Sequence, residues 1–156
     1  MMRANMKIVG FITALSGLIS GCADPQSTPW QRQIDTPCDN KSHCVSTIEQ
    51  REKFKLAPFT LTPKGIQKWS DIVALAQTLP GAKLIEQDEH YFHIEVRSAV
   101  FGFIDDFEVK QQAQQLQVRS ISRSGYSDFG VNRKRAQQFR TLLVEQQLIH
   151  DTSTSN

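Results

Sequence analysis

The sequence predicts one α+β domain, in which an antiparallel sheet of about four to five strands carries two helices on one face. Segments between residues 83 and 123 alternate apolar and polar side chains, as strands with one buried face do. Two flanking segments, residues 63–79 and 132–147, carry apolar residues at helical spacing instead. Consecutive strands pair most simply as antiparallel neighbours, and amphipathic helices cover one face of such a sheet.

Both predicted helices have recognisable sequence features. Thr62 and Pro63 form a helix start, because a hydroxyl caps free N–H groups and proline fits the first helical position. Pro80 and Gly81 end this helix. Its apolar side consists of Ile66, Trp69, Val73, Ala76 and Leu79. The second helix has an apolar side of Ala136, Phe139, Leu142 and Leu143.

The predicted strands are residues 54–61, 83–86, 91–98, 101–109 and 116–123. In the third of them, Phe92, Ile94 and Val96 alternate with Tyr91, His93, Glu95 and Arg97. One face of the sheet is therefore expected to be buried and the other to be polar and solvated. The alternation also separates His90 from His93, so we expect surface histidines and no shared metal. The solvated face is predicted to carry Glu95, Arg97, Asp106, Glu108, Arg119 and Arg123.

The start of the chain has the features of a lipoprotein signal peptide. A basic start precedes an apolar run, residues 8–19, that is too short to cross a membrane as a helix. The run ends in Ile-Ser-Gly-Cys at residues 19–22, which resembles the lipobox in which the cysteine is acylated and becomes the mature first residue. An ordinary secretory signal with a chance cysteine is the alternative. We expect residues 1–21 to be removed and Cys22 to carry palmitate and further acyl chains that anchor the protein in a membrane.

The segment after the cysteine predicts both a tether and a location. Residues 22–37 contain three prolines and no apolar period, which is typical of a flexible tether. The domain is then expected over residues 38–150, followed by a disordered polar tail, residues 151–156. In the Gram-negative sorting rule, an aspartate directly after the cysteine favours the inner membrane. Here Asp24 comes one position later, so we expect the outer membrane, with the domain facing the periplasm.

The charge balance disfavours nucleic acid as a partner. Arg3 and Lys7 leave with the signal peptide, from a chain of 18 basic and 16 acidic residues. The mature chain therefore has a formal net charge of zero. Nucleic-acid-binding domains need a strongly basic surface to neutralise phosphates.

Two cysteines, Cys38 and Cys44, remain in the mature chain. In an oxidising compartment such a close pair favours a disulfide that closes a short loop. The alternative is a metal site that also uses His43 and Asp39. Zinc sites generally have a second pair of ligands, and the sequence lacks a second cysteine pair. Free thiols are a third state that the sequence leaves open.

A polar network is predicted between residues 97 and 135. Its members are Arg97, Asp105, Asp106, Arg119, Arg123, Asp128, Asn132, Arg133 and Arg135. One interpretation is a lattice of structural ion pairs, each contributing roughly 0.2–1 kcal/mol. The other is a site for an anionic ligand or an envelope protein partner, since arginine binds carboxylate and phosphate through two parallel hydrogen bonds. On that basis we expect a non-enzymatic binding or interaction module.

An envelope hydrolase that uses Asp105 or Asp128 is the alternative function. Asp105 and Asp106 are adjacent in a strand, so their carboxylates point to opposite faces and cannot act as a facing pair. Asp128 follows Ser127, but the surrounding residues contain neither a histidine nor a nucleophile elbow. Catalysis is therefore the weaker hypothesis, and the sequence predicts neither a metal nor a cofactor.

Two long motifs carry a resemblance to a known family. They are the segment FGFIDD at residues 101–106 and the segment RSISRSGYSDFGVNRKR at residues 119–135. Both resemble the domain-of-unknown-function family numbered fourteen ninety-nine, which occurs in bacterial envelope proteins and in plants. The segment around Cys38 and Cys44 and the segment LPGAK at residues 79–83 resemble its earlier motifs, although the family's Ser-Pro-Asn before the second cysteine is missing. The resemblance covers roughly residues 38–143 and implies a single domain, without an activity or a catalytic residue to carry over.

Overall fold

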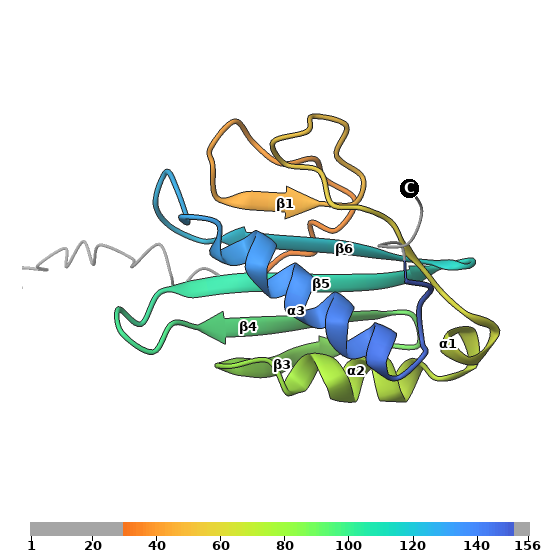
Figure 1. Ribbon diagram of the computed structural model, residues 1–156. Helices are drawn as coiled ribbons and strands as arrows, with labels where there is room; N and C mark the ends of the chain where they lie inside the picture. The colour runs from red at the N-terminus through yellow and green to blue at the C-terminus, as the bar shows by residue number, and fades with distance from the viewer. Residues whose placement is uncertain (1–29, 152–156) are drawn as a thin grey trace, which may run out of the picture.

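The computed structural model of the chain describes residues 30–151, and an antiparallel sheet lies at its centre (Figure 1). The sheet runs in the order β1-β6-β5-β4-β3, and the short β2 also pairs with β6. Its strands are β1 (Cys44–Ser46), β2 (Phe59–Thr60), β3 (Ala82–Gln87), β4 (Tyr91–Arg97), β5 (Ile104–Gln112) and β6 (Gln115–Ser122). The helices are α1 (Pro63–Gln67), α2 (Trp69–Gln77) and α3 (Val131–Glu145). The predicted antiparallel α+β fold is confirmed, with six strands and three helices in this part of the chain.

The structure departs from the prediction in the additional strand β1, which the sequence did not predict, and at two local interruptions. Pro58 has no N–H, and the strand predicted over residues 54–61 is reduced to the short β2 and isolated bridges, including one between Lys55 and Ser46 of β1. The first predicted helix is divided into α1 and α2 at Lys68, whose φ of −115° and ψ of 45° are not helical. Its predicted start is confirmed, because the Thr62 hydroxyl accepts a hydrogen bond from the Gly65 N–H at 3.0 Å.

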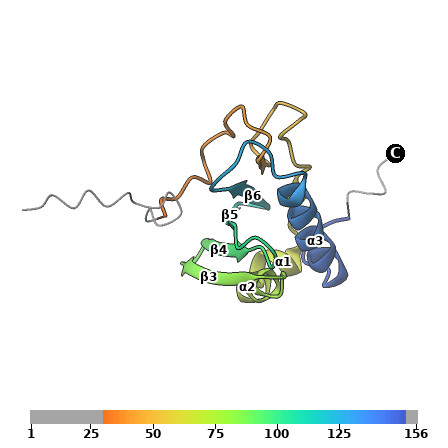
Figure 2. The ribbon, with the colours of Figure 1, turned by 90° about the vertical axis from the view of Figure 1, so that its left-hand side faces the viewer.

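Helices α2 and α3 cover one face of the sheet and enclose the hydrophobic core (Figure 2). Phe139 of α3 is fully buried and packs edge-on against Phe107 of β5 and Phe92 of β4. Ile72, Val73 and Ala76 supply the buried side of α2. The predicted apolar faces of the strands and helices therefore meet in this layer.

The opposite face of the sheet is covered by residues 30–37, which we call the strap (Figure 2). Ile34 is buried, its carbonyl accepts a hydrogen bond from the Gln117 side chain at 2.8 Å, and the Gln33 N–H donates to Glu108 at 2.9 Å. The prediction of a tether up to residue 37 and of a solvated face is corrected here. The strap is held by hydrogen bonds to polar side chains of the sheet, which hydrophobic periodicity does not reveal.

None of the helices in residues 30–151 has both the length and the apolar character needed to cross a bilayer. The predicted signal peptide and Cys22 lie outside the described residues, as does the tail after Asp151.

Candidate functional site

The predicted polar network is divided between the two faces of the sheet. Asp105 points toward α3 and bonds to Arg135, whereas Asp106 points toward the strap and bonds to His93 and Arg123. The sequence prediction that the two adjacent aspartates face opposite ways is confirmed. The predicted network is therefore not confined to one face, because Arg119 and Arg123 lie on the strap side, Arg135 lies on the helix side and Arg133 binds loop carbonyls.

The network on the helix side, which we call the helix-side cluster, consists of Asp105, Ser120, Ser122, Asn132 and Arg135. Arg135 donates to Asp105 Oδ2 at 2.6 Å, to Asn132 Oδ1 at 2.7 Å and to Ser120 Oγ at 3.0 Å. Asn132 is fully buried and donates to Ser122 Oγ at 2.9 Å. The cluster joins the first turns of α3 to β5 and β6, and it holds one cation and one anion.

The network beneath the strap, which we call the strap-side cluster, consists of Tyr91, His93, Glu95, Asp106, Glu108, Arg119 and Arg123. At its centre, Arg123 donates two hydrogen bonds to the Asp106 carboxylate, at 2.8 and 2.7 Å. His93 Nε2 lies 2.8 Å from Asp106 Oδ1. The hydrogen bonds to Asp106 raise the pKa of Arg123 above its ordinary value. His93 is completely buried, so the prediction of a surface histidine is wrong.

The second half of the strap-side cluster depends on the strap for its polar partners. Glu108 Oε1 accepts hydrogen bonds from the Tyr91 hydroxyl at 2.8 Å and from the Gln33 N–H at 2.9 Å. Arg119 Nε donates to the Thr36 carbonyl at 3.2 Å, and its Nη1 lies 3.7 Å from Glu108 Oε2, which is too long for a hydrogen bond. Burial raises the pKa of Glu108 and lowers that of Arg119. The strap thus supplies hydrogen-bond partners to both members of the Glu108–Arg119 pair, whose charges burial alone would disfavour.

Three members of the predicted network hold loops in place. Arg97 donates to the Gly102 carbonyl at 3.0 Å, within the loop of residues 98–103. Asp128 accepts from the Gly130 and Asn132 N–H groups, both at 2.9 Å, and so caps the start of α3. Arg133 donates to the carbonyls of Lys55 at 2.7 Å and Lys53 at 2.9 Å. These residues have structural partners on loops, which the sequence reading did not anticipate.

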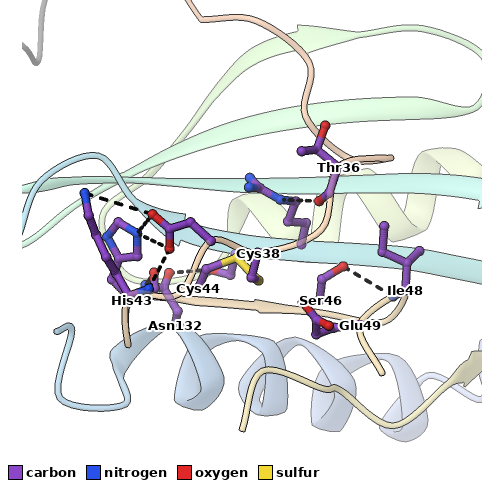
Figure 3. The surroundings of a disulfide bond; sticks show 12 residues. Thr36, Cys38, His43, Cys44, Ser46, Ile48, Glu49 and Asn132 are labelled. Atoms are coloured by element: carbon purple, nitrogen blue, oxygen red, sulfur yellow. Dashed lines mark hydrogen bonds and ion pairs between the residues drawn. A yellow bond between two sulfur atoms is a disulfide. The ribbon is translucent and has the colours of Figure 1, made fainter. Parts of the chain in front are cut away.

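Cys38 and Cys44 form a disulfide that closes a short loop beside β6 (Figure 3). The predicted disulfide is confirmed, and it packs against Phe54 and Ile121. His43 Nε2 lies 3.2 Å from Asp39 Oδ1, so the two residues of the alternative metal site pair with each other. Among residues 30–151, no three His, Cys, Asp or Glu side chains are placed to hold a metal ion.

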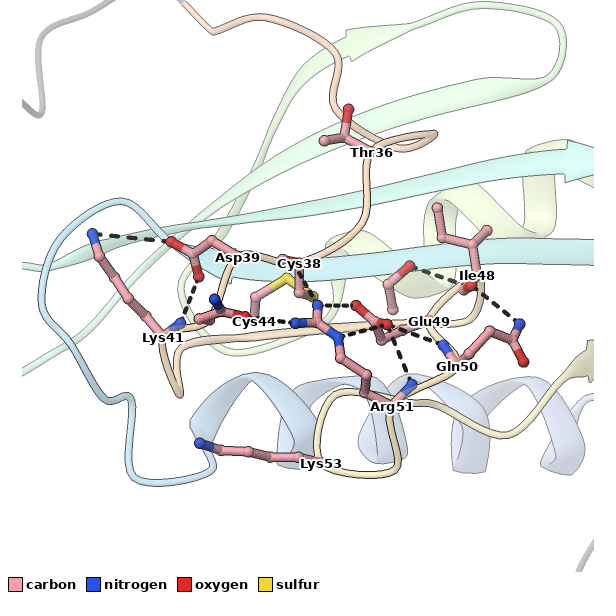
Figure 4. A network of polar contacts seen from close by, with 12 residues as sticks. Thr36, Cys38, Asp39, Lys41, Cys44, Ile48, Glu49, Gln50, Arg51 and Lys53 are labelled. Carbon is pink, nitrogen blue, oxygen red and sulfur yellow. Dashed lines mark hydrogen bonds and ion pairs between the residues drawn. A yellow bond between two sulfur atoms is a disulfide. The ribbon is translucent and has the colours of Figure 1, made fainter.

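Arg51 fixes the disulfide loop from the neighbouring turn (Figure 4). It donates to the Cys38 carbonyl at 2.6 Å, to Asn40 Oδ1 at 2.8 Å and to Glu49 Oε1 at 3.0 Å. The side-chain hydrogen bonds that Arg51 donates to Glu49 lower the pKa of Glu49 to about 2. The carboxylate is therefore ionised at neutral pH, and the ion pair holds the loop against β1.

A cavity of about 180 Å³ lies between the disulfide loop and the start of α3. Its lining includes Ser42, Lys53, Phe54, Asp128 and Arg133. The charged groups around it already have structural roles, because Asp128 caps α3 and Arg133 binds backbone carbonyls. An anion in this cavity would therefore have to compete with the backbone carbonyls for Arg133.

Exposed apolar side chains gather at one end of the sheet, on a surface that we call the apolar rim. Its members are Val100, Phe101, Phe103, Tyr126, Phe129 and Val131. Arg97 pairs with Ile104, and Asp105 pairs with Ser122, so the loops 98–103 and 123–130 leave the sheet at the same end (Figure 1). Phe101 is 75% exposed and Phe129 is 96% exposed. The sequence did not reveal this surface, because Phe101 and Phe103 fell in the predicted strand 101–109, which begins only at Ile104, and the following loop was considered for polar chemistry alone.

Comparison with known proteins places the chain in a family. No curated protein and no solved structure matches the chain. The family model described as "Protein of unknown function (DUF1499)" matches residues 36–143. The matched stretch is more than half of the chain and contains the disulfide, the helix-side cluster and both loops of the apolar rim. The chain therefore belongs to the DUF1499 family.

Proposed function

We propose that this protein is a lipid-anchored cell-envelope protein whose domain acts as a non-enzymatic binding module through the apolar rim. The observation that carries this proposal is that exposed aromatic and aliphatic side chains occur on two loops at the same end of the sheet and on the first residue of α3. Large exposed apolar patches on folded domains generally mark interaction sites. The rim replaces the predicted arginine-rich face as the contact surface, because most of those arginines have partners within the domain.

Phe129 supports a binding role for the rim most directly. Its φ of 54° lies in the left-handed region, which is unfavourable for an aromatic residue, and its side chain is 96% exposed. A residue that is both strained and exposed gains little from packing within its own domain. Strained conformations of this kind cluster at functional sites.

The two rim loops are also held in fixed conformations. Arg97 binds Gly102 in the first loop, and the rings of Phe101 and Phe103 lie 5.8 Å apart. Asp128 ties the second loop to the start of α3. A preorganised loop loses less conformational entropy when it binds a partner.

The candidate catalytic residues have structural partners that favour binding over catalysis. The Asp105 carboxylate accepts a hydrogen bond from the buried Arg135 guanidinium. Both carboxylate oxygens of Asp128 accept backbone N–H groups. These two aspartates hold α3 in place, so a hydrolytic role would require one of them to leave its present partner.

The proposed anchor rests on the lipobox-like motif that ends at Cys22. The proposed location rests on the residues directly after this cysteine, Ala23 and Asp24. The Cys38–Cys44 disulfide supports an oxidising compartment such as the periplasm. Asp24, which is not directly after the cysteine, supports the outer membrane.

Metabolic labelling with an alkyne analogue of palmitate tests the anchor. We expect the wild-type protein to be labelled and the Cys22→Ser variant to lose the label completely, because no other cysteine follows a lipobox. Cys38→Ser is the matched control and is expected to keep the label. Labelling that persists in Cys22→Ser would refute the anchor.

Photo-crosslinking in cells tests the rim as a contact surface. A benzoylphenylalanine placed at position 101 or 129 is expected to crosslink to another envelope component. The same group at position 66 is the control, since Ile66 is an exposed apolar residue on α1 outside the rim. Equal crosslinking at all three positions would contradict a specific role for the rim.

A further inference from the structure

We infer that the apolar rim binds the lipid bilayer itself, so that the loops 98–103 and 123–130 insert their apolar side chains into the interface of an anionic membrane. This inference rests on the proposed function, because the acyl chains on Cys22 hold the domain at that membrane.

The length of chain between anchor and domain keeps the rim close to the bilayer. Trp30, the first residue that the structure describes, follows Cys22 by eight positions. Eight residues span at most about 26–29 Å when fully extended. Trp30 therefore cannot lie further than this from the acylated end of the chain.

The point where the chain enters the domain also suits this orientation. The Trp30 ring stacks on His93 at 4.3 Å and lies 6.0 Å from the Arg123 guanidinium. His93 precedes the end of β4 at Arg97 by four residues, which is about 13 Å along a strand. This distance is shorter than the reach of the connecting residues, so the rim can contact the bilayer while Trp30 stays in place.

The chemistry of the rim fits a membrane interface. Phenylalanine and tyrosine rings partition into the region between headgroups and acyl chains. Exposed basic residues surround the rim on neighbouring elements: Lys41 beside Ser42, Lys83 opposite Glu95, Arg97 at the end of β4 and Lys134 in α3. Asp105 and Asp106 are buried in ion pairs, and the partly buried Asp128 binds the start of α3. Glu95 is paired with Arg123, and Asp39 lies 4.0 Å from Lys41. This end of the domain therefore presents apolar groups with basic flanks, which complements anionic headgroups.

The exposure of the rim residues favours a bilayer over a protein partner. Phe129, Val100 and Phe101 are at least 75% exposed on loop tips, so they project outward instead of lining a groove. Projecting side chains can enter a fluid bilayer without a complementary pocket. A protein partner or a second copy of this chain would instead have to supply that pocket.

Depth-dependent quenching in vesicles tests the inference with the acylated full-length protein. The vesicles contain phosphatidylethanolamine and phosphatidylglycerol with brominated acyl chains. Tryptophan introduced as Phe101→Trp or Phe129→Trp is expected to be quenched roughly twofold or more after subtraction of the wild-type signal, because its ring reaches the acyl boundary. Ile66→Trp is the matched control and is expected to show no added quenching. Acylated protein with unquenched tryptophans at 101 and 129 would overturn the inference and leave the anchor intact.

Vesicle sedimentation of the non-acylated chain separates the rim from the anchor. For the mature Cys22→Ser chain, adding Phe101→Ser and Phe129→Asn is expected to weaken vesicle partitioning about tenfold or more, because two apolar side chains leave the interface. Ile66→Ser is expected to leave partitioning unchanged. If the labelling experiment fails while this rim-dependent partitioning persists, the anchor is wrong and the rim inference stands.

Two further measurements complete the test. Thermal unfolding of Phe129→Asn is expected to match wild type, because asparagine tolerates the left-handed conformation. Sedimentation velocity of the Cys22→Ser chain without lipid is expected to show a monomer. A dimer that Phe101→Ser dissociates would identify a second copy of this chain as the occupant and overturn the inference.

Discussion

Replacing Arg135 with methionine is expected to lower the free energy of unfolding by about 3–5 kcal/mol. The substitution removes the partner of Asp105 inside a buried site, and an uncompensated buried charge is strongly destabilising. Ser120 and Asn132 lose hydrogen bonds from the same guanidinium. Urea denaturation followed by circular dichroism at neutral pH measures the effect.

Two variants control for the loss of the Arg135 side chain. Lys134→Met alters an exposed residue in the same turn of α3 and is expected to change stability by less than about 0.5 kcal/mol. The double variant Asp105→Leu/Arg135→Met is expected to recover much of the loss, because it removes both charges together. A single Arg135→Met variant as stable as Lys134→Met would show that the helix-side cluster contributes little.

Replacing Asp106 with asparagine is expected to lower the free energy of unfolding by roughly 3 kcal/mol and to loosen the strap. Asp106 is 1% exposed, accepts two hydrogen bonds from Arg123 and lies within hydrogen-bond distance of His93. Since Trp30 stacks on His93, a displaced histidine removes the surface on which the strap begins. Urea denaturation measures the stability, and trypsin cleavage after the exposed Arg32 reports the release of the strap.

Glu95→Gln is the matched control for the strap-side cluster. Glu95 also binds Arg123, but its side chain is 25% exposed, so its loss is expected to cost less than about 1 kcal/mol. Trypsin cleavage after Arg32 is expected to stay at the wild-type rate. If Asp106→Asn and Glu95→Gln lowered the free energy of unfolding equally, burial would not explain how much Asp106 contributes to stability.

Periodicity in the sequence predicted the elements and the faces of the sheet but not what covers each face. The alternation of Phe92 and His93 correctly assigned them to opposite sides. It could not show that residues 30–37 bury His93, because a proline-rich segment without apolar period carries no signal for packing on a polar surface. The hydrogen bonds from Gln33 and to Thr36 depend on a backbone path that only the folded chain defines. Trp30, a single large aromatic residue in a polar segment, was the available indication.

The sequence predicted which residues belong to the polar network but not which of them lie together in the structure. Arg133 and Arg135 are two residues apart on a helix, so their side chains leave it in different directions and reach different partners. Strand alternation separates Asp105 from Asp106 in the same way. The apolar rim was overlooked although all its members except Val100 stand in the family motifs. Phe101 and Phe103 were assigned to a predicted strand, and the aromatic residues of the later loop were not considered as a surface.

The disulfide has a mechanical consequence for a domain held by its N-terminus. Tension between the proposed anchor and the domain would act first on Trp30. It would then detach the strap from the sheet sequentially, one contact after another. The strap ends where Cys38 is covalently joined to Cys44 of β1. Peeling would therefore stop at that bond, and further load would pass into β1 and its partner β6, leaving the helices and the apolar rim in place.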